Sequence, residues 1–334
     1  MTMLVKKPGL LTTVQDTGRY GYQKYGVIVS GSMDTLSHRI ANLLVGNDEH
    51  EAVIEMTMIG ARFEFQDDAL ISICGGDFSP TIDSRPVKMW RPVLIRKGSI
   101  LSFGHVKKGC RAYLAAAGGY LTPKIMGSKS TYLRARIGGV DGRALETGDV
   151  IEISGRSPFA DFWFSQLQKR EPYTELHWSV SPEFHPFVRE EEKVQLLKGR
   201  QYGDFSEESK KALFSEPFKI TPQSDRMGYR LEGPKLSLQK KEEMISEAVS
   251  FGTIQVPSDG NPIILLADRQ TTGGYAKIGQ AASIDLPYLA QFKPGDSILF
   301  KEISIDEAQK QLLEREKMLH HLKEGLHLKL HAGR

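Results

Sequence analysis

Short runs of branched and aromatic residues, each bounded by glycine, proline or aspartate, restrict the fold of this chain more than any other feature. Runs of this length and composition are typical of β-strands rather than helices. They occupy residues 61–65, 70–74, 93–95, 100–103, 111–116, 150–153, 194–197, 219–221, 229–231, 263–267 and 297–302. The 32 glycines and 16 prolines supply turns between such runs. The sequence therefore predicts a mainly β protein with few helices.

Two early segments predict helices. In residues 32–45 the apolar side chains recur at three- and four-residue steps, and Gly46 follows where a C-terminal cap is expected. Ser30 or Ser32 is expected to cap the start of this helix. Residues 162–169 predict a second, short helix.

The last helix is predicted from Ile305 to about Lys323, where apolar residues again recur at helical spacing. Arg315 interrupts the apolar stripe. We expect this helix to lie on the second half of the chain rather than to form a coiled coil. The residues after it, which include several histidines, are expected to form a solvated tail.

The length of 334 residues favours two domains. Residues 156–190 are rich in proline and aromatic residues and predict a connecting segment between domains at 1–155 and 191–303, with a C-terminal helix and tail at 304–334. Both predicted domains end in a Gly-Asp turn that leads into a strand, which suggests a duplication.

The charge balance argues against a polyanion as partner. The chain carries 44 basic and 41 acidic residues, a net charge of +3, which favours neither nucleic acid nor a membrane surface. No run approaches the roughly 20 apolar residues of a membrane span, and the first residues lack a signal-peptide pattern. Cys74 and Cys110 suffice neither for a disulfide framework nor for a zinc site. We expect a cytoplasmic protein without a metal.

Two segments have both a structural and a functional interpretation. Residues 27–34 (VIVSGSMD) place Ser30 and Asp34 at a turn into a helix, where backbone N–H groups attract anions, although an ordinary cap explains the same pattern. Residues 224–230 (SDRMGYR) place two arginines about a glycine. Arg226 could clamp a carboxylate or phosphate, or an arginine of the pair could bind Asp225.

A third segment is the strongest candidate for a site. An apolar strand leads directly into a dense polar group at its end, Asp268, Arg269, Gln270, Thr271, Thr272, Gly273, Gly274 and Tyr275. This group supplies more donors and acceptors than one turn consumes, and the glycines allow a ligand to approach the backbone. We expect a binding site here rather than a structural turn; the residues assign no catalytic base or nucleophile.

Five blocks of the chain, in order, are similar to one family. They are residues 9–19 (GLLTTVQDTGR), 30–34 (SGSMD), 127–134 (GSKSTYLR), 224–231 (SDRMGYRL) and 268–275 (DRQTTGGY). The chain resembles the family of the 5-oxoprolinase C subunit, also called allophanate hydrolase subunit 2 or biotin-dependent carboxyltransferase family proteins.

The resemblance implies two cyclophilin-like β-barrel domains and a complex with homologues of the A and B subunits of 5-oxoprolinase. Such a complex would open 5-oxo-L-proline to L-glutamate with ATP, which this chain alone is not expected to bind firmly. Two alternatives remain. One is a regulatory protein that antagonises an inhibitor of a sporulation histidine kinase, itself a homologue of the B subunit. The other is a carboxyltransferase component acting on a urea-like amide.

For the site, we expect Arg269 to face an anionic group of a small amide substrate, with hydrogen bonds from Thr271 and Thr272. Arg226 is a second candidate to stabilise charge on the substrate. Asp268 is expected to orient Arg269, since a carboxylate paired with a guanidinium is a poor proton acceptor. In the competing structural interpretation, Arg269 only ties the end of the strand to a neighbour.

Overall fold

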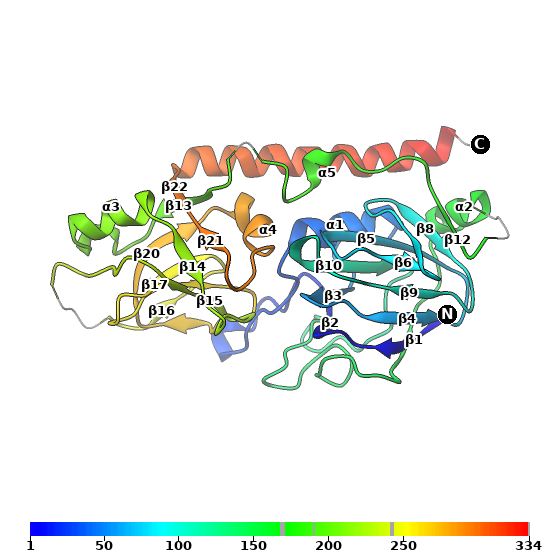
Figure 1. Ribbon diagram of the computed structural model, residues 1–334, viewed down its shortest axis with the longest axis horizontal. Helices are drawn as coiled ribbons and strands as arrows, with labels where there is room; N and C mark the ends of the chain where they lie inside the picture. Colours follow the sequence, from blue (N-terminus) through cyan, green and yellow to red (C-terminus); the bar gives the residue numbers. More distant parts are fainter. Residues whose placement is uncertain (168–170, 190, 241–243, 333–334) are drawn as a thin grey trace. The chain divides into compact units, whose positions relative to one another are not determined.

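The computed structural model describes residues 1–167, 171–189, 191–240 and 244–332. The chain forms two compact units, each made of more than one stretch of the sequence. Unit 1 contains residues 1–19, 34–188 and 318–334, and unit 2 contains residues 20–33 and 189–317. Each unit is built on β-sheets, so the predicted mainly β fold with few helices is confirmed (Figure 1).

Unit 1 is built from two six-stranded sheets, with strand orders β11-β1-β4-β9-β6-β7 and β12-β8-β5-β10-β3-β2. The strands of the first are β11 (Val150–Glu152), β1 (Thr2–Lys7), β4 (Arg62–Phe65), β9 (Ile100–Ser102), β6 (Thr81–Ile82) and β7 (Arg85–Pro86). The strands of the second are β12 (Tyr173–Glu175), β8 (Pro92–Ile95), β5 (Ala69–Asp77), β10 (Lys108–Ala116), β3 (Val53–Thr57) and β2 (Leu11–Gln15). All pairs of these strands are antiparallel.

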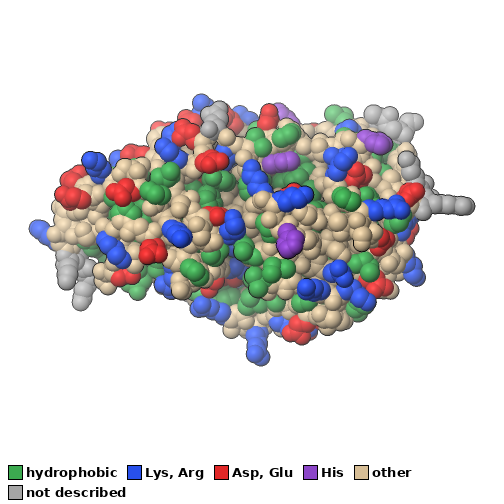
Figure 2. All heavy atoms as spheres, in the orientation of Figure 1, with side chains coloured by type: hydrophobic (Ala, Val, Ile, Leu, Met, Phe, Trp, Pro, Cys, Tyr) green, Lys and Arg blue, Asp and Glu red, His purple; other side chains and the backbone are tan. Residues whose placement is uncertain are grey.

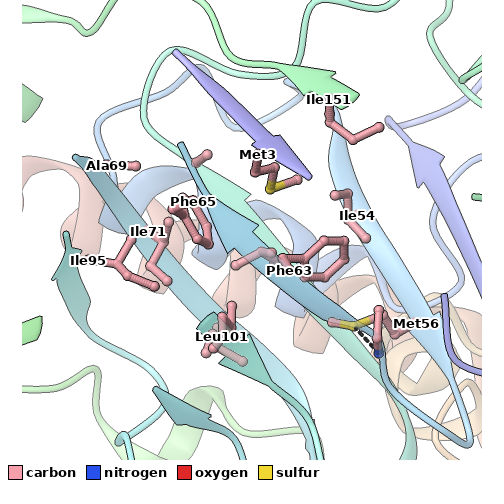
Figure 3. Packing of buried hydrophobic residues seen from close by; sticks show 14 of the residues in the cluster. Met3, Ile54, Met56, Phe63, Phe65, Ala69, Ile71, Ile95, Leu101 and Ile151 are labelled. Carbon is pink, nitrogen blue, oxygen red and sulfur yellow. Dashed lines mark hydrogen bonds between the residues drawn. The ribbon is translucent and has the colours of Figure 1, made fainter. Parts of the chain in front are cut away.

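Alternate side chains of both sheets form one buried core. Met3 of β1, Phe63 of β4, Ile54 of β3 and Ile71 of β5 are fully buried there (Figure 3). Successive side chains of a strand point to opposite faces of the sheet. Those on the other face of the second sheet pack against helices and form a second apolar cluster. These helices are α1 (Thr35–Leu44), α2 (Pro158–Gln166) and the end of α5 (Ile305–Ala332).

Unit 2 contains a nearly closed barrel. Its eight-stranded sheet has the order β21-β14-β15-β18-β17-β20-β13-β22. The strands are β21 (Ser297–Ile298), β14 (Phe218–Ile220), β15 (Gly228–Glu232), β18 (Ile263–Leu265), β17 (Thr253–Val256), β20 (Ala276–Ala281), β13 (Val194–Lys198) and β22 (Phe300–Glu302). Only Leu299 separates β21 from β22, so the two ends of the sheet order are one stretch of chain. The sheet must therefore curve round on itself.

Smaller elements complete unit 2. Strands β16 (Glu247–Ala248) and β19 (Thr272–Gly273) form a separate antiparallel pair. Helices α3 (Glu207–Ser215) and α4 (Leu286–Leu289) and the first half of α5 also belong to it. Met33, from the N-terminal segment 20–33, is fully buried in the core of this unit.

Short turns of 3-10 helix occur in the described parts of both units. They are η1 (Gln23–Tyr25), η3 (Tyr202–Asp204) and η4 (Ser283–Asp285) in unit 2, and η2 (Pro182–Phe184) in unit 1.

The helix boundaries correct three expectations. Helix α1 begins at Thr35, and Asp34 rather than Ser30 or Ser32 caps it by accepting the Ser37 N–H at 2.9 Å. Helix α2 begins earlier than predicted, because Ser157 caps it and Pro158 suits the first helical turn. The end of the predicted helix lies outside the described residues.

The third correction concerns α5, which continues to Ala332 where a solvated tail was expected. Leu319 and Leu326 are buried in the apolar cluster of unit 1, so the second half of this helix packs on the first unit, not on the second. This packing explains why the helix continues.

On the face shown in Figure 2, basic and acidic side chains are interspersed, in keeping with the net charge of +3. Within the described part of the chain, no helix is long and apolar enough to span a bilayer.

Candidate functional site

Three of the predicted site residues meet in unit 2. The Asp268 carboxylate accepts hydrogen bonds from Arg226 Nε at 2.9 Å, Arg226 Nη2 at 3.2 Å and Ser30 Oγ at 2.6 Å. All three side chains are buried. We call Ser30, Arg226 and Asp268 the polar triad.

Backbone pairing explains how residues so distant in sequence come together. Strands β15 and β18 are antiparallel neighbours, and their pairing extends beyond their ends: Leu266 N–H donates to Met227 O, and Asp268 N–H donates to Arg226 O, both at 2.9 Å. Ser30 has a positive φ of 58°, and the carbonyl of Gly31 accepts a further hydrogen bond from Arg226 Nη2.

Opposite charges meet within the polar triad. A guanidinium that binds both oxygens of a carboxylate is a strong, directional pair, and the Ser30 hydroxyl satisfies a further lone pair. Asp268 therefore binds Arg226, not Arg269 as expected from the sequence. Its carboxylate holds Arg226 and Ser30 in place.

Arg269 follows the polar triad but its side chain has a different environment. Its Nε donates to Val249 O at 3.3 Å and its Nη1 donates to Leu266 O at 3.2 Å. Burial lowers the pKa of Arg269, while Tyr20 and Asp268 act in the opposite direction; a guanidinium remains charged at neutral pH. Among the described residues its Nη2 has no hydrogen-bond partner, so the side chain is an oriented cation with N–H groups left to donate.

The rest of the segment from Gln270 to Tyr275 is partly structural. Thr272 and Gly273 form β19, and the Thr271 carbonyl accepts from Val249 N–H. A Cβ on Gly273 would lie 2.4 Å from the Gln255 amide nitrogen, so a protein side chain, not a ligand, already requires this glycine. Gln270, Thr271 and Gly274 are half-buried, and Thr272 and Tyr275 are exposed.

Asp34 belongs to unit 1 and is fully buried. Its two carboxylate oxygens accept from the backbone and the hydroxyl of Ser37, at 2.9 and 2.6 Å. The structure therefore uses Asp34 as the N-terminal cap of α1.

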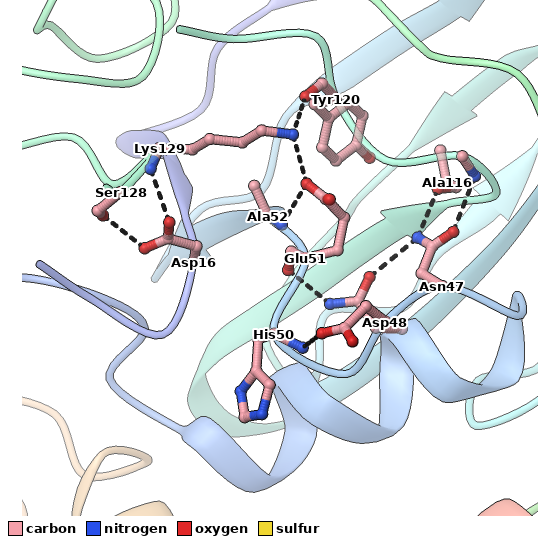
Figure 4. Close-up of polar contacts among 12 residues, drawn as sticks. Asp16, Asn47, Asp48, His50, Glu51, Ala52, Ala116, Tyr120, Ser128 and Lys129 are labelled. Carbon is pink, nitrogen blue, oxygen red and sulfur yellow. Dashed lines mark hydrogen bonds and ion pairs between the residues drawn. The ribbon is translucent and has the colours of Figure 1, made fainter. Parts of the chain in front are cut away.

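A second polar centre, which sequence reasoning did not assign to the site, unites the first and third motif blocks in unit 1. The Asp16 carboxylate accepts from Ser128 Oγ at 2.7 Å and from Lys129 N–H at 2.6 Å (Figure 4). It also accepts from Ser130 Oγ at 2.5 Å. Burial alone would raise the pKa of Asp16, but these hydrogen bonds, with one from Gly18, lower it. The loop at 127–131 thus binds an anionic group, the Asp16 carboxylate of the same chain.

The same unit contains a buried acidic residue in its sheet. Tyr113 of β10 donates to Glu55 of β3 at 2.9 Å, and the Asp34 N–H donates to Tyr113 Oη at 2.7 Å. Burial, together with Glu55 and Asp34, raises the pKa of Tyr113 well above its usual value, so its hydroxyl remains a neutral donor. A signal was present in the sequence: Glu55 interrupts the apolar run of residues 52–56 (AVIEM).

The motif blocks therefore define two buried polar centres, one in each unit of a mainly β chain. The family described as carboxyltransferase domain, subdomain A and B, matches residues 25–302. The chain belongs to this family.

Two relatives are similar to this chain over most of its length. The chain is 35% identical over 298 residues to the 5-oxoprolinase C subunit of Haemophilus influenzae, covering 89% of this chain and 90% of the relative. It is 34% identical over 321 residues to the 5-oxoprolinase C subunit of Escherichia coli, covering 96% and 97%.

A solved structure of the K. lactis urea amidolyase superposes with a TM-score of 0.85 at 30% identity. That match covers 96% of this chain but only 20% of the urea amidolyase chain. The chain thus spans a fifth of the length of that larger protein.

Proposed function

We propose that this chain is the C subunit of an ATP-dependent 5-oxoprolinase that acts in the cytoplasm with homologues of the A and B subunits. The reaction converts 5-oxo-L-proline to L-glutamate. The observation that supports this proposal most strongly is the 35% identity to a 5-oxoprolinase C subunit across 90% of that relative. A match of this length extends far beyond the five motif blocks, so the likeness does not rest on short motifs alone.

The chemistry of a lactam suits the groups available. A five-membered cyclic amide is unreactive, and ATP would supply the phosphoryl group that activates its oxygen. Charge that develops there is stabilised by fixed cations and N–H donors. Arg269 is such a cation, since two backbone carbonyls orient it and its Nη2 is left to donate. The polar triad would hold the segment that carries it.

Reconstitution tests the proposal. The A and B subunits, this chain, ATP and 5-oxo-L-proline are mixed, and glutamate is measured over time. We expect glutamate only when all three chains and ATP are present. Glutamate formation at the same rate without this chain would refute the proposed role.

Arg269→Lys tests the assignment of the site. Lysine keeps the charge but cannot reproduce the planar, two-pronged donor, so we expect roughly a ten- to a hundredfold loss of activity, about 1.5–3 kcal/mol. Arg230→Lys on the exposed side of β15 is the matched control and should retain activity. If Arg269 only ties the strand end, the variant will melt at a lower temperature yet remain active in the complex, which would end the pocket assignment.

A carboxyltransferase acting on a urea-like amide is the second candidate, and the superposition on urea amidolyase favours it. Urea and a lactam are both amides, so one scaffold can position either. The two functions separate in one assay: label transferred from carboxybiotin to urea, without glutamate formation from 5-oxo-L-proline, would select the carboxyltransferase.

A further inference from the structure

Unit 1 has a pocket of about 530 Å³ that contains none of the residues of either polar centre. The end of β5, the hairpin of β6 and β7, the start of β10 and the segment 185–188 line it. This volume lies within the range of small-molecule sites.

Aromatic rings form one wall of the pocket. The rings of Trp90 and His185 stack with centroids 4.2 Å apart and an angle of 22° between their planes. Burial lowers the pKa of His185, which favours an uncharged ring. Phe187 is also in the lining, and the Lys108 ammonium is 4.9 Å from the centroid of its ring. A flat apolar body would therefore find matching surfaces here.

The charged groups of the lining are mostly basic. Lys88 binds Glu175 at 3.3 Å, whereas among the described residues Lys107 and Lys108 form no ion pair. Asp77 is the one acidic residue in the described lining, and its Oδ1 accepts the N–H of Ser79 at 2.8 Å. The pocket thus offers two uncompensated cations to a ligand.

Two residues of the lining have a positive φ, a backbone conformation that residues other than glycine rarely adopt. Trp90 has a φ of 62° and Ser79 a φ of 48°. Hydrogen bonds maintain the first of these: Trp90 N–H donates to Ile73 O at 2.8 Å, and Val180 N–H donates to Trp90 O at 3.0 Å. Such strain persists where the surrounding structure fixes it, and it is frequent at ligand sites.

We propose that this pocket binds a flat organic anion, with its ring system against His185 and Phe187 and its carboxylate or phosphate on Lys107 and Lys108. The site is independent of the proposed oxoprolinase function, because 5-oxo-L-proline has no aromatic ring and the pocket shares no residue with the polar triad.

Fluorescence of 1-anilinonaphthalene-8-sulfonate, a flat aromatic anion, tests the proposal on the full chain. We expect saturable binding with one dye per chain, and an affinity about fivefold weaker or more after Lys107→Ala/Lys108→Ala, since two ion pairs are lost. The control Lys219→Ala/Lys235→Ala removes the same charge from unit 2 and should leave the affinity unchanged. Equal affinities in both double variants, or no binding, would overturn the proposal.

Competition identifies the anionic group. Displacement of the dye by AMP but not by adenosine or benzoate indicates a phosphate ligand, and displacement by benzoate indicates a carboxylate ligand. Competitors are tested up to about 10 mM, a concentration at which even a ligand with a Kd of about 1 mM occupies most of its sites. If neither AMP nor benzoate displaces the dye, the proposal is wrong. Thermal unfolding of each variant shows that the fold is intact.

Discussion

Arg226 and Asp268 neutralise each other inside unit 2, and each would be costly without its partner. Both are at most 6% exposed; the Ser30 hydroxyl also donates to Asp268, and the Gly31 carbonyl also accepts from Arg226. Removing one member of a buried pair leaves an uncompensated charge, which costs more than the pair itself contributes. The polar triad should therefore be sensitive to single substitutions.

Asp268→Asn should lower the free energy of unfolding by roughly 3–5 kcal/mol, because the buried Arg226 guanidinium would lose the carboxylate that binds its Nε and Nη2. Urea denaturation followed by circular dichroism measures the loss. Glu232→Gln, an exposed carboxylate of the same unit, should change the stability by less than about 0.5 kcal/mol. A similar small effect for both variants would show that Arg226 is solvated or paired elsewhere.

His38 makes a separate prediction for unit 1. Burial lowers the pKa of this fully buried imidazole to about 4. In the unfolded chain a histidine has a pKa of about 6.5. Between about pH 4 and about pH 6.5, His38 is therefore protonated in the unfolded chain but neutral in the folded chain. The contribution to stability is therefore present above about pH 6.5 and is lost as the pH falls to about 4, by about 3 kcal/mol.

Unfolding free energies measured from about pH 7 to about pH 4 check this prediction. His38→Gln should remove much of the pH dependence, whereas His50→Gln, at an exposed position, should preserve it. An unchanged slope in His38→Gln would assign the acid sensitivity in this range to other titratable groups.

At the scale of elements, α5 has two different environments along its length. In unit 2, Arg315 donates to the carbonyls of Ile284 at 2.7 Å and Ser283 at 3.1 Å, so the residue that interrupts the apolar stripe binds the turn η4. In unit 1, Leu319 is 2% exposed and Leu326 is 4% exposed. The helix is thus stabilised by tertiary contacts rather than by its own sequence alone.

Leu319→Ala should cost about 2–5 kcal/mol through lost burial and the cavity it leaves. Leu313→Ala, at a position 62% exposed in the same helix, is the matched control and should be nearly neutral. Thermal unfolding of both variants measures the difference. Equal melting temperatures would contradict the packing of the second half of α5 on unit 1.

Each run that we predicted to be a strand contains strand residues in the structure, because alternation and turn residues are local signals. Among the elements that it missed are β1, β2, β3, β17, β20 and α3. Polar residues explain part of this: Thr12, Thr13 and Gln15 are buried in the second sheet, and the Gln15 amide donates to the carbonyl of Thr131 from a distant segment. Helix α3 depends on the Ser206 cap and buries only Ser209 and Leu213, which leaves a weak apolar stripe.

The site was predictable as a set of motifs but not as a set of contacts. Ser30, Arg226 and Asp268 were all candidates. The register of β15 against β18, which local sequence does not encode, brings Arg226 and Asp268 together, and the segment 20–33 adds Ser30. For the same reason, adjacency in sequence suggested Arg269 as the partner of Asp268, whereas the backbone places the two side chains in different environments. Asp16 needed tertiary contacts to be recognised, whereas Glu55 was marked by its place in an apolar run.

At the scale of the whole molecule, the units are not consecutive stretches of chain. Unit 2 uses residues 20–33 as well as 189–317, and Met33 is fully buried in its core. Ser30 from the same short segment supplies a hydrogen bond to Asp268. A fragment that begins at residue 189 therefore lacks part of its own core.

The isolated fragment 189–317 should be less stable than the unit in the full chain, without a cooperative thermal transition near that of the full chain. A peptide of residues 20–33 added in excess should restore part of the transition, since ligands of the folded state stabilise it by mass action. A peptide with Met33→Ala and Ser30→Ala is the control and should restore less. A fragment that melts cooperatively at the full-chain temperature would show that the segment is dispensable.

Because each unit combines stretches that are far apart in the sequence, its parts are synthesised at different times on the ribosome. Ser30 leaves the ribosome 238 residues before its partner Asp268. At about 5–20 residues per second, that segment waits roughly 10–50 s for the barrel it completes. Unit 1 is completed late as well, because Leu319 and Leu326 are made after the rest of its core. Neither unit can finish folding before most of these 334 residues have been made, so nascent chains should depend on chaperones that shield apolar segments in the meantime.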